Sequence, residues 1–131
     1  MTQRIKIPET KHLGLSVNDN PTADVDLWQW FHDRGTVLMR ANSTLRALEL
    51  AARFPFDFVL SNLARVEGPV KNPSAGIELS SKLRQGGYQG PIVIYTLDKA
   101  PAVHHLALEA GASFVTEDPV SLKTWLQRLG L

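Results

Sequence analysis

Polar side chains follow several short apolar segments of this chain, and their types limit the chemistry that they could perform. They are Asn18 and Asp19 after "LGLSV", Asn62 after "FDFVLS", Thr96 at the end of "PIVIYT", and Glu117 and Asp118 after "ASFVT". Carboxylate and amide oxygens bind hard cations such as Mg²⁺, and hydroxyl groups hold phosphoryl oxygens. An amide is uncharged and its nitrogen is delocalised, so Asn62 can neither supply negative charge nor act as a useful nucleophile.

The segments that must position these side chains alternate between apolar runs and stretches of helical period. Strands are predicted at residues 12–17, 36–40, 56–61, 91–96 and 112–116. Several of them are apolar at successive positions, which is typical of a parallel sheet covered on both faces. The alternation predicts right-handed crossovers and an open, doubly wound α/β sheet, whose working surface lies at the carboxyl ends of the strands.

The predicted helices begin and end at residues that are typical of helix termini. They run from about Thr22 to Arg34, from a cap at Asn42 or Ser43 to a stop at Pro55, from about Ser74 to Gln85, from a cap at Asp98 through Ala110, and from about Val120 to Leu129. Apolar spacing predicts their buried faces: Val25, Trp28 and Phe31; Leu45, Leu48 and Ala52; Ile77, Leu79 and Leu83; Val103, Leu106, Ala107 and Ala110; Leu122, Trp125, Leu126 and Leu129. Trp28 and Trp30 are two positions apart, so one of them is expected to be partly exposed and available to a partner.

Length and composition predict one globular domain over residues 1–131, with an N-terminal extension at 1–11 and a core at about 12–129. A net charge of +1 gives no field that would favour nucleic acid or membrane surfaces. The absence of cysteine excludes disulfides, thiolate metal sites and cysteine nucleophiles. The sequence shows neither a signal peptide nor an apolar run of bilayer length, so we expect a cytoplasmic protein.

The tips "VNDNP", "SNLAR", "YTLD" and "TEDP" stand in register after the first, third, fourth and fifth predicted strands. In this arrangement the chain, from about His12 to Leu129, resembles the receiver domains of two-component response regulators. The resemblance implies a flavodoxin-like (CheY-like) fold, with five parallel strands in the order 2-1-3-4-5 and helices on both faces.

A phosphorylatable receiver has an acidic pair after its first strand and a nucleophilic aspartate after its third. It adds a Thr or Ser after the fourth strand, and a Lys followed by Pro after the fifth. The corresponding residues here are Asn18 and Asp19 for the acidic pair, Asn62 for the phosphoacceptor, Thr96 for the switch hydroxyl, and Asp118, or Glu117 with one residue inserted, for the lysine. The aromatic switch position falls on Phe114 or Val115.

These departures predict that the usual phosphorylation does not occur. Asn62 has no carboxylate to accept the phosphoryl group. Asp19 is left as the main charged ligand for Mg²⁺, so metal binding is expected to be weak and no cofactor is required. A carboxylate at 117 or 118 would repel a phosphoryl group by about 1–4 kcal/mol at a separation of about 4 Å.

Each of these residues also has a purely structural interpretation. Asn62 could bond the local backbone at the start of a loop. Asp19 could cap the first helix together with Asn18 and Asn20, Thr96 could cap or pack, and Asp118 could cap the last helix before Pro119. His104 and His105 point about 100° apart on a helix and cannot share one metal ion, whereas Glu109 is placed to pair with His105.

The connection "NLARVEGPVKNPSAG", residues 62–76, is longer than is usual between such elements. Its charges are mixed, from Arg65, Glu67 and Lys71. We interpret the 62–75 segment as a lid, a recognition loop or a surface excursion.

Taken together, the sequence predicts a single-domain receiver-like signalling protein of two-component or phosphorelay type. It is expected to act through protein contacts, with no enzymatic activity of its own. The expected partners are a histidine kinase or another signalling protein, or a second copy bound through the surface of the fourth helix, fifth strand and fifth helix. Two alternatives stay open: a receiver-fold module regulated by a small ligand or metal at the strand tips, and a small flavodoxin-like enzyme. The enzyme is disfavoured because no glycine-rich phosphate loop follows the first strand.

Overall fold

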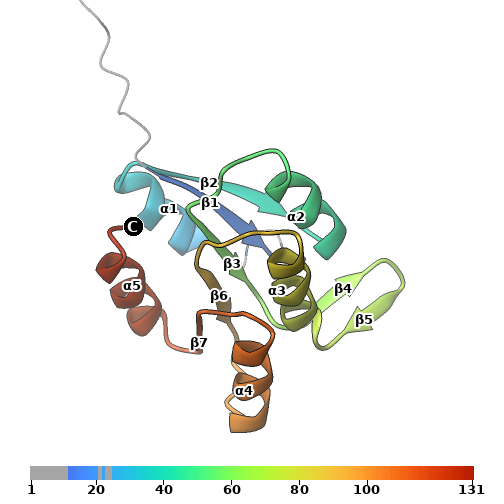
Figure 1. Cartoon of the computed structure of the whole chain (residues 1–131). Coiled ribbons are helices and arrows are strands. Elements are labelled where there is room, and N and C mark those ends of the chain that lie inside the picture. The colour runs from blue at the N-terminus through green and yellow to red at the C-terminus, as the bar shows by residue number, and fades with distance from the viewer. Residues whose placement is uncertain (1–11, 21, 23–24) are drawn as a thin grey trace, which may run out of the picture.

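A single parallel sheet organises the chain, and its strands are the predicted ones. The computed structural model describes residues 12–20, 22 and 25–131, so the predicted extension at 1–11 lies outside the described residues. The strands of this sheet are β1 (His12–Val17), β2 (Thr36–Ala41), β3 (Phe58–Ser61), β6 (Ile92–Tyr95) and β7 (Phe114–Thr116). Their order is β2-β1-β3-β6-β7, with every neighbouring pair parallel (Figure 1). Since β6 and β7 are the fourth and fifth strands of this sheet, the order 2-1-3-4-5 is confirmed.

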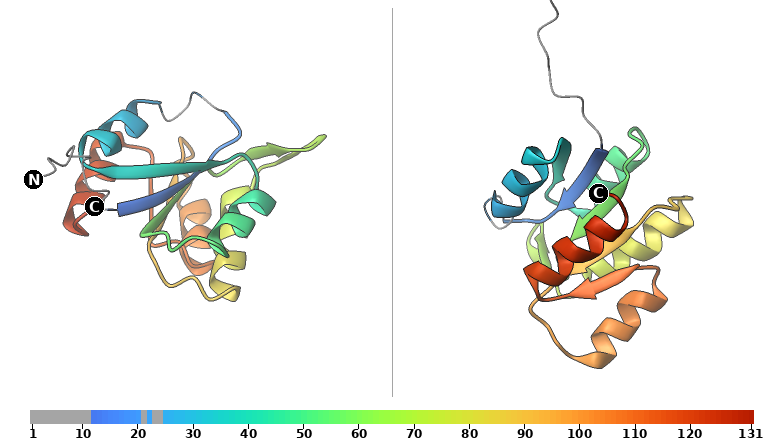
Figure 2. Two further views of the ribbon diagram at one scale, coloured as in Figure 1. Left: turned by 90° about the horizontal axis from the view of Figure 1, so that it is seen from above. Right: turned by 90° about the vertical axis from the view of Figure 1, so that its left-hand side faces the viewer.

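Helices cover both faces of the sheet, as Figures 1 and 2 show. They are α1 (Val25–Asp33), α2 (Thr44–Ala51), α3 (Ala75–Gln85), α4 (Pro101–Glu109) and α5 (Pro119–Arg128). Buried side chains of α1 and α5 share one core cluster with the strands, and those of α2 and α3 share another. The sheet is therefore desolvated on both sides, which explains the continuous apolar runs of its strands.

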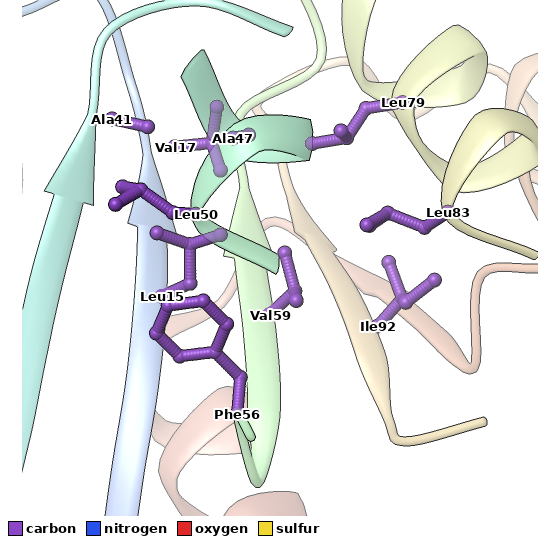
Figure 3. Close-up of a cluster of buried hydrophobic side chains, with 10 residues drawn as sticks. All are labelled: Leu15, Val17, Ala41, Ala47, Leu50, Phe56, Val59, Leu79, Leu83 and Ile92. Carbon is purple, nitrogen blue, oxygen red and sulfur yellow. The ribbon is translucent and has the colours of Figure 1, made fainter. Parts of the chain in front are cut away.

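The larger core cluster lies between the sheet and helices α2 and α3 (Figure 3). Leu15 and Val17 of β1 are fully buried there, because alternate residues of a strand point to the same face. On the other face, a Cβ on Gly14 would lie 2.2 Å from the ring of Phe58, so glycine at 14 allows that ring to cross β1. This packing holds β1 and β3 side by side and fixes where their carboxyl ends lie.

The predicted faces of α1 and α2 are partly wrong. In α2, Leu45 is 69% exposed and Ala52 is exposed, while Ala47 and Leu50 are buried. In α1, Val25 is 49% exposed and Trp28 is 38% exposed, whereas Phe31 is buried with Leu27 and Trp30 packed beside it. In each helix the apolar residues allow two overlapping stripes, and contact with the sheet decides between them. The expectation that only one tryptophan of the pair packs inward is confirmed.

The predicted faces of the last two helices are also partly wrong. In α4, Ala107 is buried but Leu106 is 54% exposed, and the N-cap is Ala100 rather than Asp98. The Asp98 carboxylate instead accepts a hydrogen bond from the Ala100 N–H at 2.9 Å, in the segment just before α4 begins. In α5, Leu122 and Leu126 are buried as predicted, but Leu129 is 47% exposed.

The 62–75 segment is more ordered than an irregular loop. It contains a two-stranded antiparallel hairpin, β4 (Arg65–Glu67) and β5 (Val70–Asn72), here called the 65–72 hairpin. Gly68 has a φ of 69° and precedes Pro69. A positive φ at the first central position followed by proline at the second fits a type II′ turn, which matches the twist of a hairpin. The hairpin projects beside α2 and α3, at the carboxyl end of the sheet (Figure 1).

None of the helices in the described part of the chain has the length and apolar character needed to cross a membrane.

Candidate functional site

The carboxyl ends of β1 and β3 bring three of the predicted site residues together. Val17 and Ser61 are paired neighbours in the sheet, and the Asn62 N–H donates to the Val17 carbonyl at 3.2 Å. The amide nitrogen Nδ2 of Asn62 lies 3.2 Å from Asn18 Oδ1, 3.1 Å from Asp19 Oδ1 and 3.0 Å from the Ala64 carbonyl oxygen. This group of three oxygens around one nitrogen is called the oxygen cage below.

Arg65 of the 65–72 hairpin extends its side chain back into this site. Arg65 is only 1% exposed, and its guanidinium is surrounded by oxygen acceptors. Nη1 donates to Ser61 Oγ at 2.7 Å and to Asn62 Oδ1 at 2.8 Å, and Nη2 donates to Thr44 Oγ1 at 2.9 Å. A buried cation is tolerated only when it is paired and hydrogen-bonded, and Arg65 meets both conditions.

The ion-pair partner of Arg65 is Glu67, two residues along the same strand. Glu67 Oε1 accepts from Arg65 Nε at 2.9 Å, and from the N–H and the hydroxyl of Thr44 at 2.7 Å each. Burial opposes ionisation of Glu67, but the hydrogen bonds from Arg65 and Thr44 outweigh it, so the pKa of Glu67 is lowered. Thr44 begins α2, so this carboxylate also stabilises the positive end of that helix.

Asp19 binds the hairpin from the opposite side. Its Oδ2 accepts the Val66 N–H at 2.8 Å, and this hydrogen bond is the main cause that lowers the pKa of Asp19. Its Oδ1 accepts from Asn62. Among the described residues, the partners of the Asp19 carboxylate are thus Asn62 and Val66, while Asn18 and Asn20 form local turns to Asn20 and Thr22. The predicted cap of the first helix involves residues 21, 23 and 24, which lie outside the described residues.

Gly76, at the start of α3, allows that helix to approach the tip of β3. A Cβ built on Gly76 would lie 2.4 Å from the Asn62 carbonyl oxygen, which is a backbone atom. The Gly76 N–H donates to the Leu63 carbonyl at 2.8 Å. The segment between Asn62 and α3 is thus held at both ends, with the hairpin between them.

A cavity of about 400 Å³ opens beside the oxygen cage, over the ends of β1 and β2. It is lined by Ser16, Asn18, Asp19, Asn20, Arg40, Ala41, Asn42 and Arg46. A larger cavity of about 610 Å³ lies at the other end of the sheet, between the ends of α2 and α3. Of the polar residues singled out by the sequence, Asn18 and Asp19 line the first cavity, and none of them lines the second.

The fold itself is found in many solved structures. The receiver domain of RstA from Klebsiella pneumoniae is 26% identical over 88% of this chain and 95% of that one, with a TM-score of 0.75. CheY4 of Vibrio cholerae is 24% identical over 89% and 97%, with a TM-score of 0.73. This chain has the receiver-domain fold of response regulators. A receiver-fold response regulator from Burkholderia pseudomallei, 22% identical with a TM-score of 0.73, over 88% of this chain and 65% of that one, carries a phosphorylated aspartic acid and a calcium ion.

Comparisons of the sequence alone find less. No family model matches the chain, and no curated protein matches it. The likeness to receiver domains is therefore carried by the arrangement of the elements and not by extended sequence identity.

The remaining residues that correspond to receiver site positions make local contacts. The Thr96 hydroxyl accepts the Asp98 N–H at 3.1 Å. Asp118 is the N-cap of α5, accepting from Val120 N at 3.1 Å and from the Ser121 hydroxyl at 2.8 Å. Those bonds, the Ser121 hydroxyl first, lower the pKa of Asp118. Among the described residues, no side-chain hydrogen bond joins Thr96 or Asp118 to the oxygen cage.

The two candidates for the aromatic switch position, Phe114 and Val115, are neighbours in β7 and point to opposite faces of the sheet. Phe114 stacks on Trp125 of α5, with ring centroids 5.2 Å apart. Val115 packs instead against the cluster that contains Ala107 of α4. The ring of Phe114 is therefore packed against Trp125 within the same domain.

The predicted pairing of His105 with Glu109 is confirmed. His105 pairs with Glu109 at 2.8 Å in an exposed i, i+4 contact, and a ring nitrogen of His104 lies 2.6 Å from the Asp98 carbonyl. In the part of the chain that the structure describes, no cluster of three or more His, Cys, Asp or Glu could hold a metal ion.

Sequence reasoning missed the central role of Arg65 and Glu67, which it treated as mixed surface charge. A signal was present in "RVEGPVKN": a Gly-Pro pair flanked by alternating residues is a hairpin pattern. In a strand, residues two apart share a face, so Arg65 and Glu67 had to point the same way. That this face turns inward depends on Thr44 and Asn62, which are distant in sequence.

Proposed function

We propose that this protein is a receiver-fold signalling component of two-component type whose output does not depend on phosphorylation of the strand-tip site. It acts through protein contacts and has no catalytic activity of its own. The receiver fold supports its place in such signalling, and the altered strand tips support independence from phosphorylation. The cytoplasm, where two-component receivers work, is its expected compartment.

One observation carries the proposal: the tip of β3 presents the amide of Asn62, whose oxygen and nitrogen both have hydrogen-bond partners. Its oxygen accepts from Arg65, and its nitrogen donates to the oxygen cage. An amide cannot attack a phosphoryl donor as a carboxylate does. The related fold from Burkholderia pseudomallei carries a phosphorylated aspartic acid, and this chain has no equivalent acid at the position that we assign.

The fifth-strand tip supports the same conclusion. A receiver that accepts a phosphoryl group needs a cation there, and Glu117 and Asp118 follow β7 instead. Asp118 is committed to the first turn of α5. A phosphoryl group at this edge of the sheet would be repelled by the carboxylates of Glu117 and Asp118, and no lysine stands at either position to bind its oxygens.

The expected output surface is formed by α4, β7 and α5. Exposed apolar side chains lie on or beside these elements: Leu97 is 81% exposed, Leu106 54% and Val120 68%. Where such side chains form one contiguous patch, they mark an interaction surface. We propose that a signalling partner, such as a histidine kinase, or a second copy of the chain binds here.

Intact-mass measurement after incubation with acetyl phosphate and Mg²⁺ tests the phosphorylation claim. The protein should gain no labile phosphoryl group, while a receiver with the full set of acidic residues, treated in parallel, should gain one. A base-labile or hydroxylamine-labile gain on this protein would refute the proposal.

Substitution of Leu106→Glu tests the surface. Light scattering coupled to size exclusion, together with capture of partners from the source cell, should show weaker self-association or weaker partner capture than in the unaltered protein. Leu45→Glu is a matched control, because Leu45 is 69% exposed on α2, away from the proposed surface. Equal effects of the two substitutions would contradict the assignment of the surface.

A second candidate function is regulation by a small anion in the cavity of about 400 Å³ beside the strand tips. Arg46 and the amides of Asn20 and Asn42 line it, and such groups suit carboxylate or phosphate oxygens. Thermal shifts with a panel of nucleotides, phosphate and dicarboxylates would test it. A stabilisation that is lost in Arg46→Gln would favour this function over the protein-contact proposal.

A further inference from the structure

The oxygen cage has the composition of a cation site, but a nitrogen atom already lies at its centre. The surrounding oxygens belong to the side chains of Asn18 and Asp19 and to the backbone of Ala64, at 3.0 to 3.2 Å from Asn62 Nδ2. These are hydrogen-bond distances, and oxygens that bind Mg²⁺ or Ca²⁺ lie at about 2.0–2.6 Å from the ion. The –NH₂ group therefore fills the space that a divalent cation would need.

We propose that the Asn62 amide is a built-in substitute for a bound cation, and that Arg65 is the positioning residue that keeps its –NH₂ group in the cage. This inference rests on the proposed function, because it explains how the strand-tip site holds its shape without metal or phosphoryl group. The site then differs from an empty receiver pocket: it is occupied by the protein's own side chains.

The orientation of the Asn62 amide follows from its neighbours on both sides. Arg65 carries only hydrogen-bond donors, so the atom 2.8 Å from its Nη1 must be the amide oxygen. The other side presents three oxygens, of which the Ala64 carbonyl and the ionised Asp19 carboxylate can only accept, so it requires the –NH₂ group. A reversed amide would place oxygen against oxygens and nitrogen against the guanidinium.

The position of Arg65 is determined in turn by Glu67 and Thr44. Glu67 Oε1 lies 2.9 Å from Arg65 Nε and 2.7 Å from the Thr44 N–H, so the guanidinium is joined to the first residue of α2. Val66, between the two charged residues, donates its N–H to Asp19. The 65–72 hairpin thus holds both sides of the cage, Asp19 directly and Asn62 through Arg65.

The single change Asn62→Asp should convert the oxygen cage into a cation site. In Asn62→Asp the –NH₂ group is replaced by a carboxylate oxygen, which faces Asn18 Oδ1, Asp19 Oδ1 and the Ala64 carbonyl with no donor between them. The cage then offers two carboxylates, an amide oxygen and a backbone carbonyl, which is a donor set that divalent cations accept. Asn42→Asp is a matched control, because it adds the same charge to the same edge of the sheet outside the cage.

Calorimetric titration with MgCl₂, CaCl₂ and MnCl₂ tests whether the Asn62 amide takes the place of a cation. The proteins compared are the unaltered protein, Asn62→Asp and Asn42→Asp. Asn62→Asp should bind at least tenfold more tightly than both other proteins, and the unaltered protein should show no saturable binding at millimolar concentrations. Saturable binding by the unaltered protein, or equal binding by the two variants, would overturn the inference. These outcomes are independent of phosphorylation, which the mass measurement reports separately.

The role of Arg65 is tested by NMR of the Asn62 side-chain –NH₂ protons. In the unaltered protein, they should exchange slowly with solvent, because they are held among three oxygens. Arg65→Met should increase their exchange rate at least tenfold more than it does for the amide protons of the β6 backbone, and Arg65→Lys should recover part of the protection. Uniform acceleration across the protein would show that Arg65 acts only on stability, and unchanged Asn62 protons would show that it does not orient the amide; either result would overturn the assignment. Should Arg65→Met fail to fold, Glu67→Gln, which removes the ion-pair partner only, gives the same comparison.

Discussion

The Nη1 atom of Arg65 lies 2.8 Å from the Oδ1 atom of Asn62, and this contact joins the hairpin after β3 to the tip of β3 itself. The tip is therefore not an open loop end. Its amide is held by a buried guanidinium on one side and by Asn18, Asp19 and Ala64 on the other. The stability of the protein should depend on these same contacts.

Arg65→Met should lower the free energy of unfolding by about 2–4 kcal/mol, because it leaves Glu67 and the surrounding oxygens without their charged donor. Chemical denaturation measures this change. Arg46→Met is the control, since Arg46 pairs with Glu49 on the exposed side of α2 and should cost no more than about 0.5 kcal/mol. A similar small loss for both variants would contradict the structural role of Arg65.

Stability should fall on acidification because the pKa values of Asp19 and Glu67 are both lowered in the folded protein. Their ordinary values are 3.8 and 4.5, and the folded state binds protons less readily than the unfolded chain. Their contribution is present in full above about pH 5 and is lost as the pH falls through the folded pKa values.

Glu67→Gln isolates the glutamate part of this pH dependence. The free energy of unfolding of the variant should be lower near neutral pH and should fall less steeply between about pH 5 and pH 3 than that of the unaltered protein. Urea denaturation at several pH values measures the slope. Parallel profiles for the two proteins would show that Glu67 does not titrate with folding.

Gly76→Ala should destabilise the fold by about 1–3 kcal/mol, because the new methyl group would press on the backbone of Asn62. A Cβ on Gly76 would lie 2.4 Å from the Asn62 carbonyl oxygen, whereas a Cβ on Gly86, at the end of α3, would lie 3.4 Å from the Lys82 carbonyl oxygen. Gly86→Ala is thus the matched control and should have little effect. Thermal denaturation of both variants checks the difference, and equal melting temperatures would argue against a close approach at Gly76.

The strands and their order were predictable from sequence, because buried parallel strands are apolar at successive positions and alternate with helices. The tips of β1 and β3 were predictable for the same reason: Asn18, Asp19 and Asn62 each end an apolar run. The cap at Asp118 also followed from its position before Pro119. These features depend on residues that are close together along the chain.

The remaining features depend on contacts between distant residues. Leu45 and Leu50 both stand at helical spacing, and only packing against β1 and β3 shows that Leu50 is the buried one. Arg65 and Glu67 look like surface charges until Thr44, 21 residues away from Arg65, provides the acceptor that draws them inward. No local pattern encodes that contact.

The central claim is that this receiver fold does not use an acyl phosphate at the tip of β3. A phosphorylation assay on the unaltered protein tests it most directly. Asn62→Asp is assayed beside it, because this change restores the missing carboxylate and leaves the other strand tips unaltered. The new carboxylate would lie beside the Arg65 guanidinium, whose charge reduces its nucleophilicity, and no lysine replaces Asp118 to receive the transferred oxygens. Intact-mass measurement with acetyl phosphate and Mg²⁺ should therefore show no phosphoryl gain on the unaltered protein or on Asn62→Asp. A labile gain of one phosphoryl group on the unaltered protein would contradict the account, and a gain on Asn62→Asp alone would show that Asn62 is the sole obstacle and that Arg65 and Asp118 are not.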